Sequence, residues 1–198
     1  MDIDNKKLIK TAREYFSNAS VCLNNDDLDG AVANLNEAIH LMPNYVAAWC
    51  RRGIVWRRKG DDKKALADYD EAIRLNPHYE GAWNNRGVFW GVKNELDKAS
   101  ADINEAIRLN PKFEFAWNNR GNVWKRRGEY DKAIADYDEA ISINPQYAPA
   151  WSNRGNTWKE KGEYDKAIAD FDEALRLDPG NQHAIHNRND AISMMSNM

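Results

Sequence analysis

Few side chains in this 198-residue chain could carry out chemistry, and none belongs to a recognisable reactive set. His183 and His186 are spaced i, i+3, which would supply half of a metal site, but no third Cys or His lies nearby. Asp-x-Asp-Glu carboxylate pairs recur along the chain, whereas a catalytic pair would be unique. No Gly-rich loop, H-E-x-x-H or G-x-S-x-G motif occurs. We therefore expect a protein that is not an enzyme and that needs no metal or other cofactor.

The composition narrows the remaining classes of function. Hydrophobic residues make up 42% and charged residues 30%, as in soluble proteins that form a core. The longest apolar run, residues 45–50, is far shorter than the roughly 20 residues of a membrane span. Residues 1–7 carry acids where a secretory signal carries bases, so we expect a cytoplasmic protein with no membrane partner. Two cysteines are too few for a disulfide framework, and a net charge of −3 argues against a nucleic-acid partner.

The elements that would position any site are set by an internal repeat. All eight tryptophans fall into two ladders with a step of 34 residues: Trp49, Trp83, Trp117 and Trp151, and Trp56, Trp90, Trp124 and Trp158. A fixed period in the range of 20–50 residues is typical of a solenoid, in which each unit buries its apolar face against its neighbours. We expect the indole rings to be buried and to dominate the core, since each would remove about 150–250 Å² from water.

Each unit reads as a helical hairpin. Trp117, Gly121 and Trp124 are spaced i, i+4, i+7, which places them on one face of a helix that Gly128 ends. A second helical pattern runs from Tyr130 and stops before Pro145, because residues that precede proline avoid the α region. The small residues of the glycine column are expected to let the two helices approach closely.

These residues, W-x-x-x-G-x-x-W followed by A-x-x-x-[YFI]-x-x-A and a closing proline, resemble the tetratricopeptide repeat family. The resemblance implies an all-α superhelix whose first helices line a concave groove. We count five units within one domain, residues 1–198: about 12–45, 46–79, 80–113, 114–147 and 148–181, with a capping helix at about 182–195. The first unit departs from the pattern, with Tyr15, Ala19 and Cys22 in the Trp, Gly and Trp columns.

The groove side of the first helices is rich in amides and bases. On a helical wheel, Asn119, Asn122 and Arg126 lie opposite Trp117. Each Asn offers one acceptor and two donors, so a row of them can pair with the backbone of an extended peptide. Alternatively, these amides meet only water or the adjacent helix. The predicted peptide-binding residues are Arg51, Asn84, Asn85, Asn118, Asn119, Asn122, Lys125, Arg126, Asn153, Asn156 and Lys159.

Charge is expected to differ between the two helices of each unit. Bases gather on the first helices and acids on the second, which would steer an acidic partner toward the groove. Cations at the ends of first helices also stabilise the helix dipole, which explains part of the pattern. The ladder Arg52, Arg86, Arg120, Arg154 and Arg188 repeats in step with Asp68, Asp102, Asp136 and Asp170, and we expect a structural ion-pair ladder rather than a binding site.

The function favoured by these observations is a non-enzymatic protein–protein interaction module that binds a protein or peptide, expected to be acidic, in the groove. The alternative is a self-assembling scaffold, a homo-oligomer that docks through the atypical first unit and the methionine-rich end, Met194, Met195 and Met198. Nucleic-acid binding ranks last, because the aromatic rings that could stack on bases are expected to lie in the core.

Overall fold

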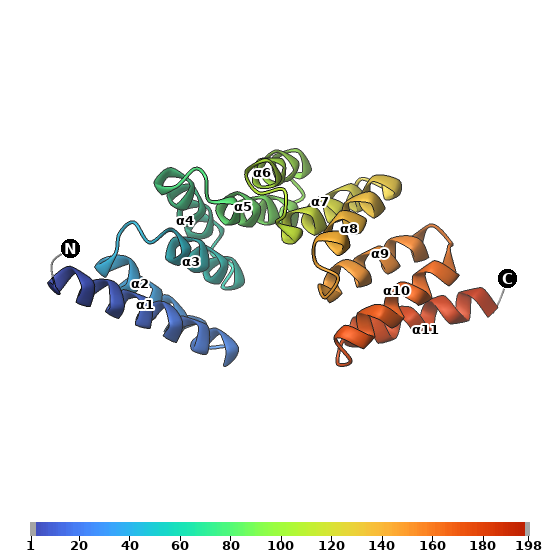
Figure 1. The fold of residues 1–198 in the computed structure, drawn as a ribbon, viewed down its shortest axis with the longest axis horizontal. Coiled ribbons are helices and arrows are strands. Elements are labelled where there is room, and N and C mark those ends of the chain that lie inside the picture. The colour runs from blue at the N-terminus through green and yellow to red at the C-terminus, as the bar shows by residue number, and fades with distance from the viewer. Residues whose placement is uncertain (1–2, 197–198) are drawn as a thin grey trace. The chain divides into compact units, whose positions relative to one another are not determined.

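The structure is a computed structural model that describes residues 3–196, so Met1, Asp2 and Met198, which entered the expectations above, lie outside the described residues. Over this range the chain forms eleven α-helices and no strand (Figure 1). Their bounds are α1 Ile3–Asn24, α2 Leu28–Leu41, α3 Val46–Arg58, α4 Asp62–Leu75, α5 Glu80–Val92, α6 Leu96–Leu109, α7 Glu114–Arg126, α8 Tyr130–Ile143, α9 Ala148–Glu160, α10 Tyr164–Leu177 and α11 Gln182–Ser196. The all-α class is confirmed. None of the described helices is long and apolar enough to cross a membrane.

The helices divide between two compact units, residues 1–93 and 94–198, here called unit 1 and unit 2. In unit 1, α1 packs on α2 and α3 on α4; in unit 2, α7 packs on α8, α9 on α10, and α11 on α10. The boundary falls between α5 and α6, which the sequence places in one repeat. The number of repeats and the single domain therefore stay predictions.

The helix ends follow the sequence pattern at most positions. The capping helix α11 begins at Gln182 as expected, whereas α1 begins at Ile3, well before residue 12. Between the first and second helix of a repeat the chain turns through a residue with positive φ, which is Gly60, Gly128 or Gly162 at three positions. Asp26 and Asn94 hold the same position with φ of 57° and 63°, a conformation that costs a residue with a side chain more than it costs glycine.

The core is built on the second helices. One column with the 34-residue step, Leu35, Tyr69, Ile103, Tyr137 and Phe171, is fully buried among alanines. A Cβ atom on Gly53 or Gly121 would lie 2.6 Å from the ring of Tyr69 or Tyr137. The glycine column therefore makes room for an aromatic ring of the second helix, not only for its backbone.

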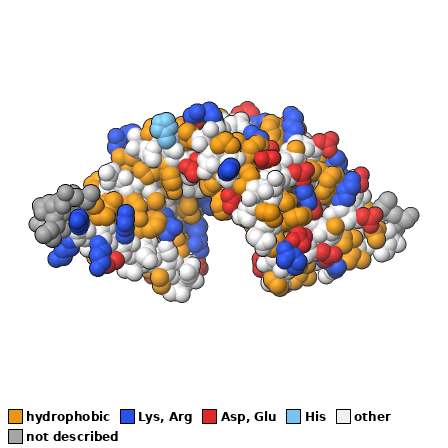
Figure 2. Space-filling view, in the orientation of Figure 1, with side chains coloured by type: hydrophobic (Ala, Val, Ile, Leu, Met, Phe, Trp, Pro, Cys, Tyr) orange, Lys and Arg blue, Asp and Glu red, His pale blue; other side chains and the backbone are white. Residues whose placement is uncertain are grey.

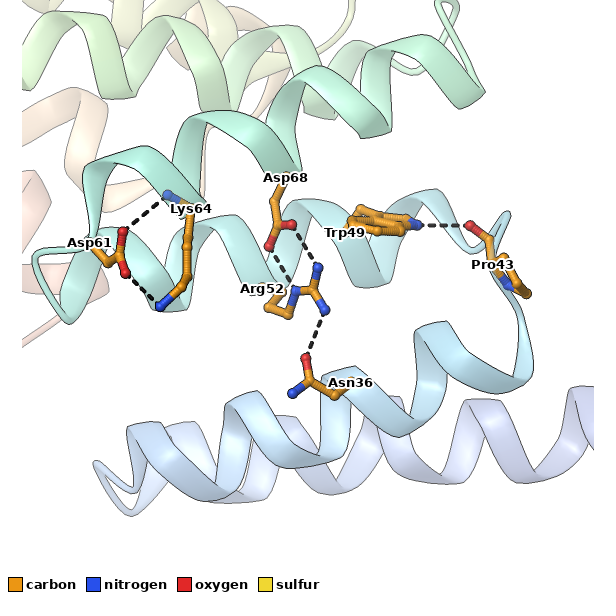
Figure 3. Close-up of polar contacts among 7 residues, drawn as sticks. All are labelled: Asn36, Pro43, Trp49, Arg52, Asp61, Lys64 and Asp68. Atoms are coloured by element: carbon orange, nitrogen blue, oxygen red, sulfur yellow. Dashed lines mark hydrogen bonds and ion pairs between the residues drawn. The ribbon is translucent and has the colours of Figure 1, made fainter.

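The tryptophans occupy a different place from the one predicted. All eight are half-buried, and most of them pack against the buried clusters, so they lie at the edge of the core and not fully inside it as expected. The Nε1 atoms of Trp49 and Trp117 donate to the carbonyl oxygens of Pro43 and Pro111, at 2.8 and 2.9 Å (Figure 3 shows the first). An indole N–H needs an acceptor, and the carbonyl before each first helix supplies one at the edge of the core.

The arginine ladder is confirmed as structural in both units. Arg52 donates two hydrogen bonds to Asp68, both 2.8 Å long, and a third to Asn36 at 2.7 Å (Figure 3). Arg120 contacts Asp136 and Asn104 in the same way, and Arg154 contacts Asp170 and Asp138. Each guanidinium also lies over a tryptophan ring, at 4.7 Å from the ring centroid for Arg52 and Trp49. One arginine thus ties a first helix to two second helices.

Candidate functional site

In unit 2, predicted site residues on neighbouring first helices contact one another. Asn153 of α9 donates from Nδ2 to Oδ1 of Asn118 of α7, at 2.9 Å. Asn118 is only 3% exposed, while Asn119 and Asn153 are half-buried. The buried Asn118 amide therefore holds the Asn153 side chain in place, and Asn119 and Asn153 form the surface.

Asn122 joins this surface to the core. Its Oδ1 accepts a hydrogen bond of 2.8 Å from the hydroxyl of the fully buried Tyr137. Burial raises the pKa of Tyr137 well above its ordinary value, and the nearby Thr157 hydroxyl opposes that rise in part. The orientation of the Asn122 amide is thus fixed by a group beneath it.

The cations of unit 2 have partners within the protein. Nζ of Lys125 lies 3.1 Å from Glu160, and Nζ of Lys159 donates to Asn187 at 2.6 Å and lies 3.6 Å from Asp190. Arg126 is exposed and reaches Asn94 at 3.4 Å. Cationic and anionic side chains are also interspersed on the face seen in Figure 2. Lys125 and Lys159 therefore contribute less positive potential than their number suggests.

A pocket of about 310 Å³ opens between α9 and α11. Asn156 lines it, and within the described part of the chain its side chain makes no hydrogen bond. The other lining residues are Pro149, Ser152, Asn153, Asn181, His183 and Asn187. Of these six, only Asn153 was among the predicted site residues, and the other five were missed. The signal was available, because Asn181 interrupts the aromatic column Tyr45, Tyr79, Phe113 and Tyr147.

The predicted residues of unit 1 have more apolar surroundings. Arg51 donates to Ser20 and lies 4.0 Å from the centroid of the Phe16 ring, and its pKa is lowered by burial. Asn84 is buried at 6% exposure. Asn85 is half-buried. Burial raises the pKa of Cys50 to about 12, and the Asn85 side chain opposes that rise in part. A thiol with such a pKa is not a nucleophile at neutral pH.

Metal ligands are not grouped in the described residues. No group of three or more His, Cys, Asp or Glu side chains there could hold a metal ion. Nε2 of His186 lies 3.3 Å from Asp190, while His183 faces the pocket. What the surface offers is hydrogen-bonding amides and an open pocket.

Comparison with family models identifies the repeat. The tetratricopeptide repeat model matches residues 46–79, 115–147 and 148–181, and the protein prenyltransferase alpha subunit repeat model matches residues 96–127. A comparison with curated proteins found no match. Proteins built from tetratricopeptide repeats are generally non-enzymatic modules that bind other proteins, and the fold supports this general class of function.

Solved structures of similar fold cover most of the chain. MamA is 26% identical with a TM-score of 0.61, over 86% of this chain and 93% of MamA. A thermophilic tetratricopeptide repeat protein of Thermus thermophilus is 19% identical with a TM-score of 0.79, over 93% and 98%. YrrB, described as a tetratricopeptide repeat protein with an unusual peptide-binding site, is 22% identical with a TM-score of 0.60, over 93% and 97%. The family model covers just over half of the chain, and the chain belongs to the tetratricopeptide repeat family.

Proposed function

We propose that unit 2 binds an extended segment of a partner protein along α7, α9 and α11, without catalysing a reaction. The observation that carries the proposal is the open pocket lined by Asn156, Asn153 and Asn187. An amide can donate to a peptide carbonyl and accept from a peptide N–H. Such a surface can therefore bind the backbones of peptides that differ in sequence. A peptide-binding site is described for YrrB, so the fold is able to carry one.

The predicted residues take two different roles in this proposal. Asn119, Asn153 and Asn156 contact the peptide directly. Asn118 and Asn122 orient that surface through their bonds to Asn153 and Tyr137. In unit 1, Asn84 is the buried support, and Asn85 and Arg51 are the groups at the surface.

Lys125, Arg126 and Lys159 would bind acidic residues of the partner. Because Lys125 and Lys159 already pair with Glu160 and Asp190, an acidic peptide must compete with these carboxylates. We therefore expect the affinity to fall only modestly as salt is raised, and to depend more on the amides than on the charges.

The test uses peptides selected from a displayed random library on the wild-type protein. Asn156→Ala should weaken their binding about fivefold, since a lost hydrogen bond at a partly buried site is worth about 1 kcal/mol. Asn189→Ala is the matched control, because Asn189 is an exposed amide of α11 outside the pocket. Equal affinity of the wild type and Asn156→Ala would reject this surface as the binding site.

Asn156 is a cleaner position for this test than Asn153. Replacing Asn153 with Ala would also remove the hydrogen bond to the buried Asn118 and would lower stability. An effect of Asn153→Ala on binding could then come from either cause.

Self-association is the second candidate, and the exposure of α11 favours it. Met194 and Met195 are 46% and 43% exposed at the end of this helix, and methionines suit adaptable contacts. Light scattering over a concentration series should show oligomers in the wild type and monomers in the double variant Met194→Lys, Met195→Lys. A wild type that stays monomeric at all concentrations would remove this candidate.

A further inference from the structure

The pocket between α9 and α11 lies where an aromatic column of the repeat stops. The residue just before α3, α5, α7 and α9 is Tyr45, Tyr79, Phe113 and Tyr147 in turn. The corresponding residue before α11 is Asn181. Asn181 lines the pocket, so the cavity coincides with a missing ring.

Tyrosine rings fill the equivalent places at other junctions within each unit. Tyr79 packs against Cys50 at the α3–α5 junction, and a Cβ atom on Gly81 would lie 3.0 Å from its ring. By the repeat, Cys50 corresponds to Ser152 and Gly81 to His183, two walls of the pocket. In unit 1, the space that corresponds to the pocket between α9 and α11 is therefore occupied by the ring of Tyr79.

Two more junctions repeat this arrangement. The Tyr45 ring lies 5.0 Å from that of Phe16 on α1, and the Tyr147 ring lies 5.0 Å from that of Phe115 on α7. By the same repeat, Phe16 corresponds to Ser152 and Phe115 to Pro149. At each of these three junctions, a residue that corresponds to a wall residue of the pocket thus contacts a tyrosine ring.

Asn181 does not fill the space because its side chain serves the helix. Its Oδ1 accepts from the backbone N–H of Ala184 at 3.1 Å, which caps the N-terminus of α11. The aromatic residues before α3, α5, α7 and α9 make no such capping bond. Because Asn181 caps the helix and carries no aromatic ring, a pocket of about 310 Å³ remains open to a ligand.

We infer that this pocket receives the side chain of a tyrosine from the bound peptide, in the place that Tyr45, Tyr79 and Tyr147 fill at the other junctions. The inference rests on the proposed function and adds an anchor residue to it. The ring would lie between Pro149 and His183, with Ser152 at the floor.

The polar lining selects tyrosine over phenylalanine. Asn156 makes no side-chain hydrogen bond within the described residues, and His183 is exposed at the rim. A phenol combines an apolar ring with a hydroxyl that these groups can bind, whereas a phenylalanine ring would leave them without a partner.

The experiment titrates N-acetyl-tyrosine methylamide into ¹⁵N-labelled protein, with the phenylalanine and alanine derivatives as comparisons. We expect the side-chain NH₂ signals of Asn153, Asn156 and Asn187 to shift with the tyrosine derivative, less with phenylalanine, and not with alanine. Shifts confined to other helices, or the same shifts with all three derivatives, would overturn the inference.

Two variants of Asn181 separate the pocket from the cap. Asn181→Tyr supplies the ring from the chain itself and should weaken binding of the tyrosine derivative at least about tenfold. Asn181→Ser keeps a capping side chain and the open pocket, so its affinity should match that of the wild type. If Asn181→Tyr does not fold, Asn156→Phe narrows the same pocket from α9 and should have the same effect.

The outcomes distinguish this inference from the proposed function. Library peptides that lose affinity in Asn156→Ala but bind Asn181→Tyr as tightly as the wild type would overturn the tyrosine anchor and leave the peptide surface standing. A tyrosine derivative blocked by Asn181→Tyr, with library peptides unaffected by Asn156→Ala, would support the pocket and reject the proposed peptide surface.

Discussion

Tyr69 of unit 1 and Tyr137 of unit 2 hold the same column of the repeat, yet their hydroxyl groups differ. The Tyr137 hydroxyl donates to Asn122, whereas the Tyr69 hydroxyl is buried without a hydrogen bond. Fifteen residues before Tyr69 the repeat has Ile54 in place of an amide. Arg57 is close enough to lower the pKa of Tyr69, but burial outweighs it and raises that pKa to about 12.

The difference shows that an amide of the predicted binding row can satisfy a buried group of the core. In unit 2, polar contacts run from Tyr137 through Asn122 to the surface of α7. In unit 1, the same layer is apolar, with Phe89 packed on Tyr69 at 6.2 Å between ring centroids. The two units use the same repeat positions for packing. They differ in whether the buried tyrosine hydroxyl has a hydrogen-bond partner.

The largest expected effect comes from the arginine ladder, which both units share. Asp68→Ala should lower the free energy of unfolding by about 3–5 kcal/mol, because Arg52 then loses its anionic partner and keeps only the neutral amide of Asn36 and the Trp49 ring. Asp170→Ala should cost less, because Arg154 also contacts Asp138. Urea unfolding of both variants checks the order, and a larger loss for Asp170→Ala would contradict the account.

The glycine column should give the next largest effect, equal in the two units. Gly53→Ala and Gly121→Ala each force a Cβ atom to within 2.6 Å of a tyrosine ring and should cost about 1–3 kcal/mol. Gly155→Ala is the matched control, since its nearest atom would be 3.1 Å away and alanine favours the helix. Thermal unfolding measures all three, and a Gly155→Ala loss as large as that of Gly121→Ala would argue against the ring contact.

The tyrosine hydroxyls themselves should give opposite signs. Tyr137→Phe should lower the free energy of unfolding by about 1 kcal/mol through the lost bond to Asn122. Tyr69→Phe should leave stability unchanged or raise it, because it removes a buried hydroxyl without a hydrogen bond. Denaturant unfolding of the pair checks this, and equal losses would mean that the two layers do not differ.

The smallest effect is expected at the turns with positive φ. Asn94→Gly should raise the free energy of unfolding by less than about 1 kcal/mol, since glycine adopts a φ of 63° without strain but loses more entropy on folding. Gly128→Asn, the reverse change at the same turn position, should lower it by a similar amount. A change of the same sign in both variants would show that backbone strain is not the cause.

Much of the fold could be predicted from the sequence because periodic positions carry it. The 34-residue step predicted the helices, the Arg52–Asp68 type of ion pair and the capping helix, since each depends on residues at fixed spacing. The half-burial of the tryptophans could not be predicted in the same way. In the ladder Trp49, Trp83, Trp117 and Trp151, each indole donates a hydrogen bond to a carbonyl in the preceding turn, which the periodicity does not encode.

The candidate site was predictable only in part. The helical wheel placed Asn119 and Asn122 on one side, but it could not show that Asn118 is buried or that Lys159 contacts Asn187. These facts depend on how one first helix meets the next. The pocket at Asn181 depends on a residue that breaks the repeat, and a search for recurring residues passes over such a position.

The most direct test of the central claim is an NMR titration of a library-selected peptide into ¹⁵N-labelled protein, read at the side-chain NH₂ signals of asparagine. The account predicts saturable shifts at Asn153, Asn156 and Asn187, with no change at Asn104 of α6 or at Asn144, which directly follows α8. Shifts confined to Asn104 and Asn144, with the three pocket amides unaffected, would contradict it.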